Sequence, residues 1–530
     1  MVLVQFQSDF RFAATFLSFN PSRSDPTPRF PCSFRRPTRI RGWSPVTKAA
    51  FKRNVEKKNE KKEPNICTAD ELHYVEVEKS EWRVALWRYL PSPEAPSRNH
   101  PLMLLSGVGT NAIAYDLSPE SSFARFMSGQ GYDTWILELR GAGLSAQGVD
   151  FGQVKDPLNA MSQRKDFFVK DGKYGTLANT AYGSFSMKRS FSGFSETGKS
   201  FAFADQIEDF IQKLVNIMEE GERSPAARIF YMQDRVSTAL KDVQKQLDLI
   251  VKYDWDFDHY LEEDVPAAVR CHSFSIKGFH LRSSVMEYIK TKSKPKDGKL
   301  FAVGHSMGGI LLYAMLSRCC FEGRDSGLAS VTALASSLDY MSSKSSLKLL
   351  LPLASADPLQ VLNIPVIPIG PLIAAAYPFA TRPPYILSWL NSQISASDMM
   401  HPKLFEKLVM ENFETVPAKL LLQLATAIQE GGLRDRSGTF FYKNHLGKSN
   451  VPILAIAGDQ DLICPPEAVY VCNINGAETV KLIPEPLVTY KVFGEPGGPH
   501  YAHYDIVGGR LAIDLVYPCI IEFLNRHDEA

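Results

Sequence analysis

Residues 300–309 have the sequence Leu-Phe-Ala-Val-Gly-His-Ser-Met-Gly-Gly. The four apolar residues from Leu300 to Val303 predict a short buried strand, and the apolar run from Ile310 to Leu316 predicts a helix. The turn between them has the pattern Gly-x-Ser-x-Gly around Ser306. Glycine is needed on both sides of the serine, because a sharp turn brings backbone against these positions and a Cβ would collide with it. We expect the turn to strain Ser306 and to lift its hydroxyl to the helix N-terminus.

This strand–turn–helix context resembles the nucleophile elbow of the α/β-hydrolase family. The resemblance implies an α/β fold with a mostly parallel sheet flanked by helices, and it implies that Ser306 is the catalytic nucleophile. The alternative is a glycine–serine turn that matches by chance, since short patterns arise by accident. The other parts of such a site should then be absent from the chain.

Further strands are predicted on both sides of the elbow. A strand pair at 72–78 and 82–90 is followed by mostly apolar segments at 101–105, 131–139, 328–335, 451–456 and 489–493. The α/β-hydrolase core is thereby divided into three parts, at 63–145, 254–340 and 450–530.

The strand at 101–105 leads into Ser106-Gly-Val-Gly-Thr-Asn111. In the α/β-hydrolase family a His-Gly-X turn occupies this place, and X offers a backbone N–H to the oxyanion. The resemblance therefore implies that Val108 supplies one donor and Met307, the residue after the nucleophile, supplies the other. Ser106 stands where the family usually has histidine. This departure leaves the backbone donors in place but changes what supports the loop.

The family order of catalytic residues is serine, then acid, then histidine. Asp461 follows a buried strand at the spacing where the family keeps its acid, with Asp459 and Asp339 as alternatives. His503 lies in a His-x-Asp pattern before an apolar segment, which resembles the acid-lipase branch of the family. His500 is its competitor.

These three residue types suit nucleophilic catalysis. A serine hydroxyl is a weak nucleophile, so a histidine must take its proton. The carboxylate holds the imidazole in the correct tautomer and stabilises its cation. The sequence thus contains a complete candidate set in Ser306, Asp461 and His503, and it predicts no metal and no cofactor.

Two other segments resemble the acid-lipase branch. Arg140-Gly-Ala-Gly-Leu-Ser145 follows a strand, and Trp255 to Ala268 contains the pattern Asp-Phe-Asp-His-Tyr-Leu-Glu-Glu-Asp-Val-Pro. In that branch, the second pattern precedes the helix before the elbow. The matches cover about half of the chain, in separate segments.

Residues 146–253 are an insertion that the minimal fold does not need. Apolar residues recur at helical spacing over 202–218 and 229–250, which predicts a pair of helices. The pair could pack on the sheet edge or bind a partner. Residues 193–200 match the phosphate-loop pattern Gly-x-x-x-x-Gly-Lys-Ser, but the polar segment before them cannot form the required buried strand. Nucleotide binding is therefore not expected.

Residues 341–449 occupy the place of the family's cap, and we expect a helical, apolar cap there. From Pro358 to Thr381 the chain has no charged residue. Five prolines in this stretch argue against a membrane-spanning helix, since each interior proline costs a helix about 3 kcal/mol. Short apolar pieces that line a lipophilic pocket or touch a membrane surface are expected. Ordinary core packing is the alternative.

Residues 1–62 have the composition of a transit peptide and linker. Up to Arg53 there are ten Arg or Lys residues against two Asp residues, with scattered serines and prolines. This pattern is typical of organelle targeting. The absence of a long amphipathic arginine helix near Met1 favours a chloroplast, and hence a plant or algal source, over a mitochondrion. A disordered basic tail is the alternative.

The composition bounds the remaining possibilities. The chain has 530 residues, 45% of them hydrophobic, and a net charge of +1, which gives no general attraction to nucleic acid. Its eight cysteines form no Cys-x-x-Cys pattern, which favours a reducing compartment.

Taken together, the sequence predicts a serine hydrolase that cleaves a carboxylic ester with a lipophilic acyl group through an acyl-enzyme on Ser306. An acyltransferase would use the same triad. A binding protein without activity on this fold is the third reading, because a fold alone never proves activity.

Overall fold

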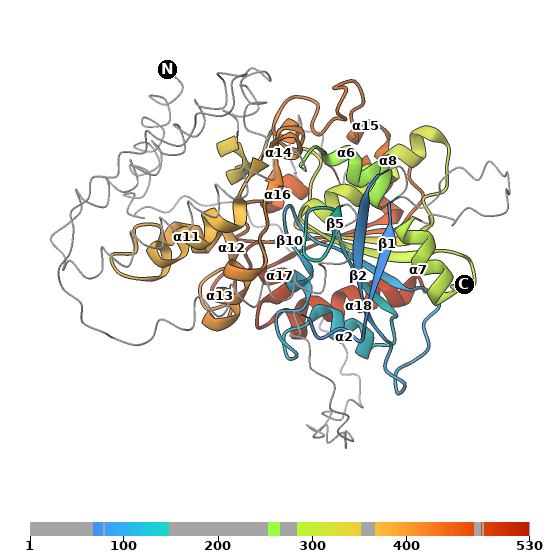
Figure 1. The fold of residues 1–530 in the computed structure, drawn as a ribbon, viewed down its shortest axis with the longest axis horizontal. Helices are drawn as coiled ribbons and strands as arrows, with labels where there is room; N and C mark the ends of the chain where they lie inside the picture. Colours follow the sequence, from blue (N-terminus) through green and yellow to red (C-terminus); the bar gives the residue numbers. More distant parts are fainter. Residues whose placement is uncertain are drawn as a thin grey trace, which may run out of the picture. The chain divides into compact units, whose positions relative to one another are not determined.

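The computed structural model describes residues 67–77, 80–147, 253–265, 284–350, 366–470, 479 and 482–528. One sheet organises this part of the chain (Figure 1). Its strands lie in the order β1 (Glu71–Glu76), β2 (Trp82–Tyr89), β4 (Thr134–Glu138), β3 (Leu102–Leu105), β6 (Leu300–His305), β7 (Leu328–Leu334), β10 (Ile453–Gly458) and β11 (Val488–Phe493), with β5 (Ala146–Gln147) paired to β2.

The β1–β2, β2–β4 and β2–β5 pairs are antiparallel, and the pairs from β4 to β11 are parallel. Each predicted core strand is present, with ends that differ by a few residues. A mostly parallel sheet with flanking helices and a strand–turn–helix elbow is the α/β-hydrolase fold that the sequence predicts.

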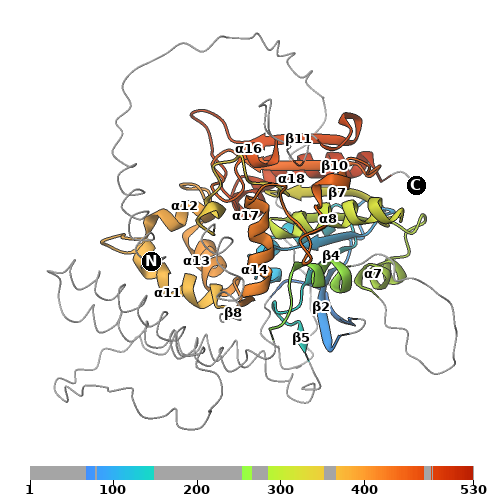
Figure 2. The ribbon, with the colours of Figure 1, turned by 90° about the horizontal axis from the view of Figure 1, so that it is seen from above.

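Helices flank the sheet on both faces (Figures 1 and 2). The helices of the core are η2 (Ala112–Tyr115), α2 (Phe123–Gly129), α6 (Phe257–His259), η5 (Tyr260–Asp264), α7 (Val285–Ser293), α8 (Met307–Glu322), α16 (Pro466–Val469), η10 (Glu485–Leu487), α17 (Asp505–Gly508), η11 (Ala512–Val516) and α18 (Tyr517–Arg526).

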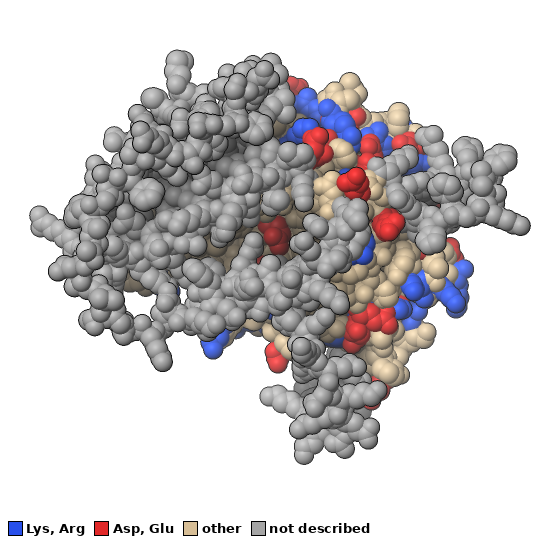
Figure 3. All heavy atoms as spheres, viewed as in Figure 1, with Lys and Arg blue, Asp and Glu red and all other residues tan. Residues whose placement is uncertain are grey.

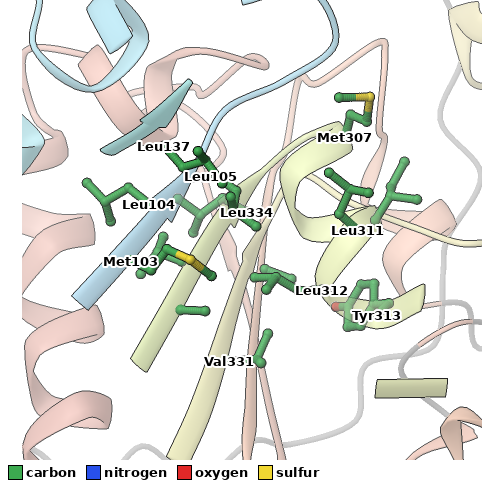
Figure 4. Packing of buried hydrophobic residues seen from close by; sticks show 14 of the residues in the cluster. Met103, Leu104, Leu105, Leu137, Met307, Leu311, Leu312, Tyr313, Val331 and Leu334 are labelled. Carbon is green, nitrogen blue, oxygen red and sulfur yellow. The ribbon is translucent and has the colours of Figure 1, made fainter. Parts of the chain in front are cut away.

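Most residues of helix α8 are buried, because its sequence is apolar nearly all round. Figure 4 shows Leu311 and Leu312 beside the sheet, where Leu105 of β3 and Leu334 of β7 also point into the packed layer. All four side chains are almost completely buried. Truncating one such leucine to alanine typically costs about 2–5 kcal/mol, so the helix that begins at the elbow is firmly held.

Between β7 and β10, the described residues of the range 346–446 form a further set of elements. They are η6 (Ser346–Leu350), β8 (Val366–Ile367), α11 (Ile369–Thr381), η7 (Ser388–Leu390), α12 (Asn391–Ile394), α13 (Pro402–Glu411), β9 (Val416–Pro417), α14 (Ala418–Ala425), η8 (Thr426–Ile428) and α15 (Lys443–Leu446). Helices α11, α12 and α13 gather on one side of the sheet in both ribbon views (Figures 1 and 2). The short strands β8 and β9 pair antiparallel beside them.

Helix α11 differs from the short apolar pieces expected here. It continues through Pro371 and Pro378 over thirteen residues. Pro371 is tolerated because it lies in the first turn, where N–H groups have no partner within a helix. Pro378 removes one hydrogen bond close to the helix end. Within the described ranges, none of the helices combines the length and apolar character needed to cross a bilayer.

Several predictions concern residues outside the described ranges. These are the transit peptide at 1–62, the helix pair within 202–250 and the phosphate-loop pattern at 193–200. The described part of the 146–253 insertion consists of β5 at the start and Tyr253 at the end.

Candidate active site

The elbow has the geometry that its glycines predict. Ser306 has φ 55° and ψ −121°, a conformation that side chains rarely adopt. A Cβ on Gly304 would lie 2.4 Å from the backbone of Gly308, and one on Gly308 would lie 2.1 Å from the carbonyl oxygen of Leu105. Both distances are far below any normal contact. The neighbouring backbone therefore requires glycine at both positions, and it forces Ser306 into the sharp turn.

Strand β7 fixes the backbone of Ser306 from the other side. The N–H of Ser306 donates to the carbonyl oxygen of Leu334 at 2.8 Å. The hydroxyl of Ser336 donates to the carbonyl oxygen of Ser306 at 2.7 Å. The strained turn is thus held by two hydrogen bonds in addition to helix α8.

Asp461 and His503 meet at the carboxyl end of β10, although 42 positions separate them in the sequence. Nδ1 of His503 lies 2.8 Å from Oδ2 of Asp461, and both side chains are buried. The other carboxylate oxygen accepts the N–H groups of Ile463 and Cys464 at 2.9 and 2.8 Å. Because a carboxylate can only accept, Nδ1 carries the proton and Nε2 of His503 is free to take another.

His305 connects this pair to the elbow. Its Nε2–H donates to the carbonyl oxygen of His503 at 2.9 Å, and the two rings lie 4.7 Å apart between centroids. Burial, assisted by His503, lowers the pKa of His305 to about 3, so its imidazole is neutral. Since His305 directly precedes Ser306, this bond brings the backbone of His503 to the elbow.

No hydrogen bond within 3.5 Å joins Ser306 Oγ to His503 among the residues that the structure describes. Catalytic hydrogen bonds are often long before substrate binds and tighten in the complex.

The loop at 106–111 lies against Ser306. A Cβ on Gly107 would be 3.3 Å from Cβ and 3.7 Å from Oγ of Ser306. The next residue, Val108, is one of the two predicted oxyanion donors. The other, Met307, is the first residue of α8, and its N–H has no partner within the helix.

Ser106 supports this loop in place of the family's histidine. Its hydroxyl donates to the carbonyl oxygen of Asn111 at 3.3 Å, across the base of the loop. Thr110 adds a second brace, since its hydroxyl donates to the carbonyl oxygen of Gly107 at 2.9 Å. Two short side chains thus brace the loop from within.

The competing residues are paired elsewhere. Nδ1 of His500 is hydrogen-bonded to Asp459. Asp459 lies on the same loop as Asp461, and His500 lies on the same loop as His503. Asp339 forms an ion pair with Lys443 at 2.7 Å. The structure therefore joins His503 to Asp461, and it joins two of the three alternatives, His500 and Asp459, to each other.

The two acid-lipase-like segments also come together. The guanidinium of Arg140 contacts Asp264 through Nε at 2.8 Å, and the N–H of Arg140 donates to the same carboxylate at 3.0 Å. Both side chains are buried. From the sequence, no structural or catalytic role is predicted for these segments. The observed ion pair ties the loop after β4 to the segment that precedes the elbow strand.

No separate role was predicted for two further buried carboxylates, Glu138 and Asp505. Glu138 accepts the N–H groups of Ala112 and Leu144 at 3.0 and 2.8 Å, and burial raises its pKa. Asp505 accepts three hydrogen bonds beside His503. A signal existed for Glu138, because a carboxylate in an otherwise apolar strand needs a partner.

Within the described ranges, no group of three or more His, Cys, Asp or Glu side chains is arranged to hold a metal ion. Five cysteines there are free thiols, namely Cys67, Cys319, Cys320, Cys464 and Cys519. On the face seen in Figure 3, the described surface carries basic and acidic side chains interspersed rather than separated by sign.

Comparison with known proteins gave matches to solved structures. No family model matches the chain, and no curated protein sequence matches it. A thermophilic esterase from Thermogutta terrifontis is 11% identical, with a TM-score of 0.40 over 87% of this chain and 100% of that chain. A soluble variant of monoglyceride lipase from Saccharomyces cerevisiae is 11% identical, with a TM-score of 0.41 over 87% and 97%.

A putative lipase from Acinetobacter baumannii is 12% identical, with a TM-score of 0.39 over 86% of this chain and 92% of that chain. These likenesses are too distant to say anything of activity. The order of the strands, their mostly parallel pairing and the elbow at Ser306 give the chain the α/β-hydrolase fold.

Proposed function

We propose that this protein is a serine hydrolase that cleaves a carboxylic ester through an acyl-enzyme on Ser306. The observation that carries the proposal is the buried Asp461–His503 pair, linked by His305 to a strained serine elbow. Nucleophile, base and orienting acid occur in the family order and lie at the same edge of the sheet.

The proposed reaction has two halves. Nε2 of His503 takes the proton of Ser306 as its oxygen attacks the ester carbonyl, and Asp461 stabilises the imidazolium. The N–H groups of Val108 and Met307 stabilise the oxyanion, with each donor contributing about 3–4 kcal/mol. The imidazolium then protonates the departing alcohol. Water, activated by the same histidine, releases the acid and restores the serine.

The composition of the cap supports the proposal that the substrate carries a lipophilic acyl group. Between Asp357 and Asp398 the only charged residue is Arg382. Four large apolar side chains on this stretch are exposed to solvent, namely Leu372, Tyr385, Ile386 and Trp389. Exposed apolar residues gathered on one segment are typical of surfaces that meet apolar ligands or lipid, so a membrane-bound substrate fits this cap.

The acyltransferase reading shares every step up to the acyl-enzyme. It differs only in the acceptor, which would be an alcohol instead of water. A binding protein without activity would need no strained serine, because strain is retained only where something requires it. The hydrolase is favoured because the described residues supply the whole mechanism without a second substrate.

The first prediction tests the nucleophile. Purified protein should be labelled by a fluorophosphonate and should hydrolyse p-nitrophenyl esters. Ser306→Ala should abolish labelling and lower turnover by a factor of about 10⁶, since no other group can form the acyl-enzyme. Labelling that persists in Ser306→Ala would exclude Ser306 as the nucleophile. An unlabelled, inactive wild-type protein with an intact fold would favour the binding protein.

The second prediction tests the substrate class. Ile373 lies partly buried in α11, within the uncharged stretch. If this helix lines the acyl pocket, Ile373→Asp should raise KM for long-chain esters far more than for p-nitrophenyl acetate. The reason is that a buried charge is costly and each methylene contributes about 0.8 kcal/mol of transfer free energy. Equal losses on both esters, or no loss on either, would remove the support for a lipid substrate.

A further inference from the structure

The backbone around His503 is hydrogen-bonded to the cap. The N–H of Tyr504 donates to the carbonyl oxygen of Ile394 at 2.9 Å, and the N–H of Arg510 donates to the carbonyl oxygen of Met399 at 2.7 Å. The first of these bonds holds the residue directly after the histidine. The short connection between α12 and α13 is thus fastened to the histidine loop at both of its ends.

Asp505 lies between these two bonds. Its side chain is fully buried, and its two carboxylate oxygens accept three hydrogen bonds. Two come from the cap, namely the hydroxyl of Ser395 at 2.6 Å and the N–H of Ala396 at 2.7 Å. The third comes from the N–H of Ala502 at 2.8 Å. One carboxylate therefore joins the cap to the residue directly before His503.

His503 itself has few other anchors. Its side chain is held by Asp461, and its carbonyl oxygen by His305. On one side of it, Tyr504 donates its N–H to Ile394 of the cap. On the other side, Ala502 donates its N–H to Asp505, which the cap in turn holds through Ser395 and Ala396. Removal of the cap connection would leave His503 attached to Asp461 and His305. It would take away the bond to Tyr504 and two of the three bonds that hold Asp505, and so loosen the backbone on both sides of the imidazole.

The outer part of the cap is attached differently. The ring of Tyr377 in α11 lies 6.3 Å from that of Phe405 in α13, and Gly370 lies against the backbone of Phe413. These contacts are made within the cap. Figures 1 and 2 show α11 on the far side of the cap from the sheet. The connection at Ile394–Met399 is therefore one part of the cap that can transmit its position to the histidine.

We propose that Asp505 is a positioning residue that couples the cap to His503, so that the imidazole is aligned with Ser306 only when Ile394–Met399 is docked. The inference rests on the proposed function. It makes this connection a part of the active site rather than a free lid.

The third prediction compares two substitutions of Asp505. Asp505→Ala removes all three hydrogen bonds and should lower kcat for p-nitrophenyl acetate on the order of 10²-fold, the cost typical of a displacement of about 1 Å. KM for this small ester should stay within about threefold. Asp505→Asn keeps an oxygen for both N–H groups and offers its amide to Ser395, so it should restore kcat to within about fivefold.

Controls separate positioning from general destabilisation. Rates should be expressed per fluorophosphonate-titrated site, so that unfolded protein is not counted. Lys407→Met removes another bond between cap and core, to the carbonyl oxygen of Leu117, and should leave kcat unchanged. If Asp505→Ala does not fold, Ser395→Ala removes a single bond and should lower kcat by about five- to tenfold. A normal kcat per site in the folded Asp505 or Ser395 variant would overturn the proposal.

Hydrogen–deuterium exchange tests the coupling without activity. In Asp505→Ala, or in Ser395→Ala if that is the folded variant, peptides covering 394–399 and 502–510 should lose protection together, while Asp505→Asn should retain it in both. Loss of protection in only one segment would overturn the coupling. If the wild-type protein is inactive but the variant still loses protection in both segments together, the proposed function is refuted and the coupling stands.

Discussion

Two Asp–His pairs stand side by side on the loops after β10 and β11, and they differ mainly in burial. In the Asp461–His503 pair the side chains are 0% and 3% exposed. In the Asp459–His500 pair they are 23% and 36% exposed. Both pairs use Nδ1 of the histidine. The residue types and the nitrogen used are therefore the same, and only the surroundings distinguish them.

The difference shows what an orienting carboxylate requires. Around Asp461, two backbone N–H groups occupy the second oxygen, so the carboxylate has one direction left for the histidine. Asp459 also receives one N–H, from Tyr501 at 2.8 Å, but water reaches both partners of that pair. A pair in contact with water is screened and worth about 0–1 kcal/mol, whereas a buried pair fixes the tautomer and orientation of its imidazole.

Of the predictions that bear on this comparison, the fourth has the largest expected effect and could break it. His503→Ala should lower kcat by a factor of about 10⁴ or more, because no base remains to accept the proton of Ser306. His500→Ala is the matched control and should change kcat by less than about threefold. Initial rates on p-nitrophenyl acetate, with circular dichroism as a check of the fold, decide between the pairs.

Substituting the aspartate of each pair by asparagine, which has nearly the same shape, repeats the test. Asp461→Asn should lower kcat on the order of 10³- to 10⁴-fold by favouring the wrong tautomer, and Asp459→Asn should have little effect. The opposite ranking would reassign the base to His500. A loss in Asp339→Asn with full activity in Asp461→Asn would move the acid one strand earlier.

The fifth prediction is smaller and extends the comparison to a third carboxylate of these loops. Burial, the largest cause, raises the pKa of Asp505 from 3.8 to about 6. Because the folded-state pKa lies above the unfolded value, the contribution of Asp505 to the free energy of unfolding is complete below pH 3.8 and is lost as the pH rises through 6.

Lowering the pH from 8 to 5 should therefore stabilise the wild-type protein, relative to Asp505→Asn, by about 1–2 kcal/mol. Asparagine does not titrate, so it provides the reference for all other groups. Urea unfolding of both proteins at the two pH values measures this difference. An unchanged difference would mean that Asp505 stays ionised throughout and that the three donors outweigh its burial.

Much of the fold could be predicted because local patterns and tertiary structure agree. The apolar run at Leu300–Val303 and the glycines around Ser306 leave a single arrangement, since the strand, the turn and the helix each require the same residues. The predicted helix began at Ile310, whereas α8 begins at Met307. The two glycines hid its first turn, because glycine is a poor helix former.

The residues that hold the candidate catalytic residues in place were harder to predict from the sequence. Spacing distinguished Asp461 from Asp459, but their burial depends on how the two loops fold against each other. The bonds from Asp505 to Ser395 and Ala396 connect segments more than one hundred positions apart. Polar contacts over such separations have no local pattern, so the sequence alone could not show them.

The positive φ of Ser306 has a consequence for how such a protein can change over time. Glycine adopts this conformation without strain, so Ser306→Gly could make the chain more stable while removing its nucleophile. Selection for stability alone would favour the loss of this serine. A lineage that keeps it keeps a strained residue because of what its hydroxyl does. If the serine is kept in this elbow, its hydroxyl has a function that outweighs the strain.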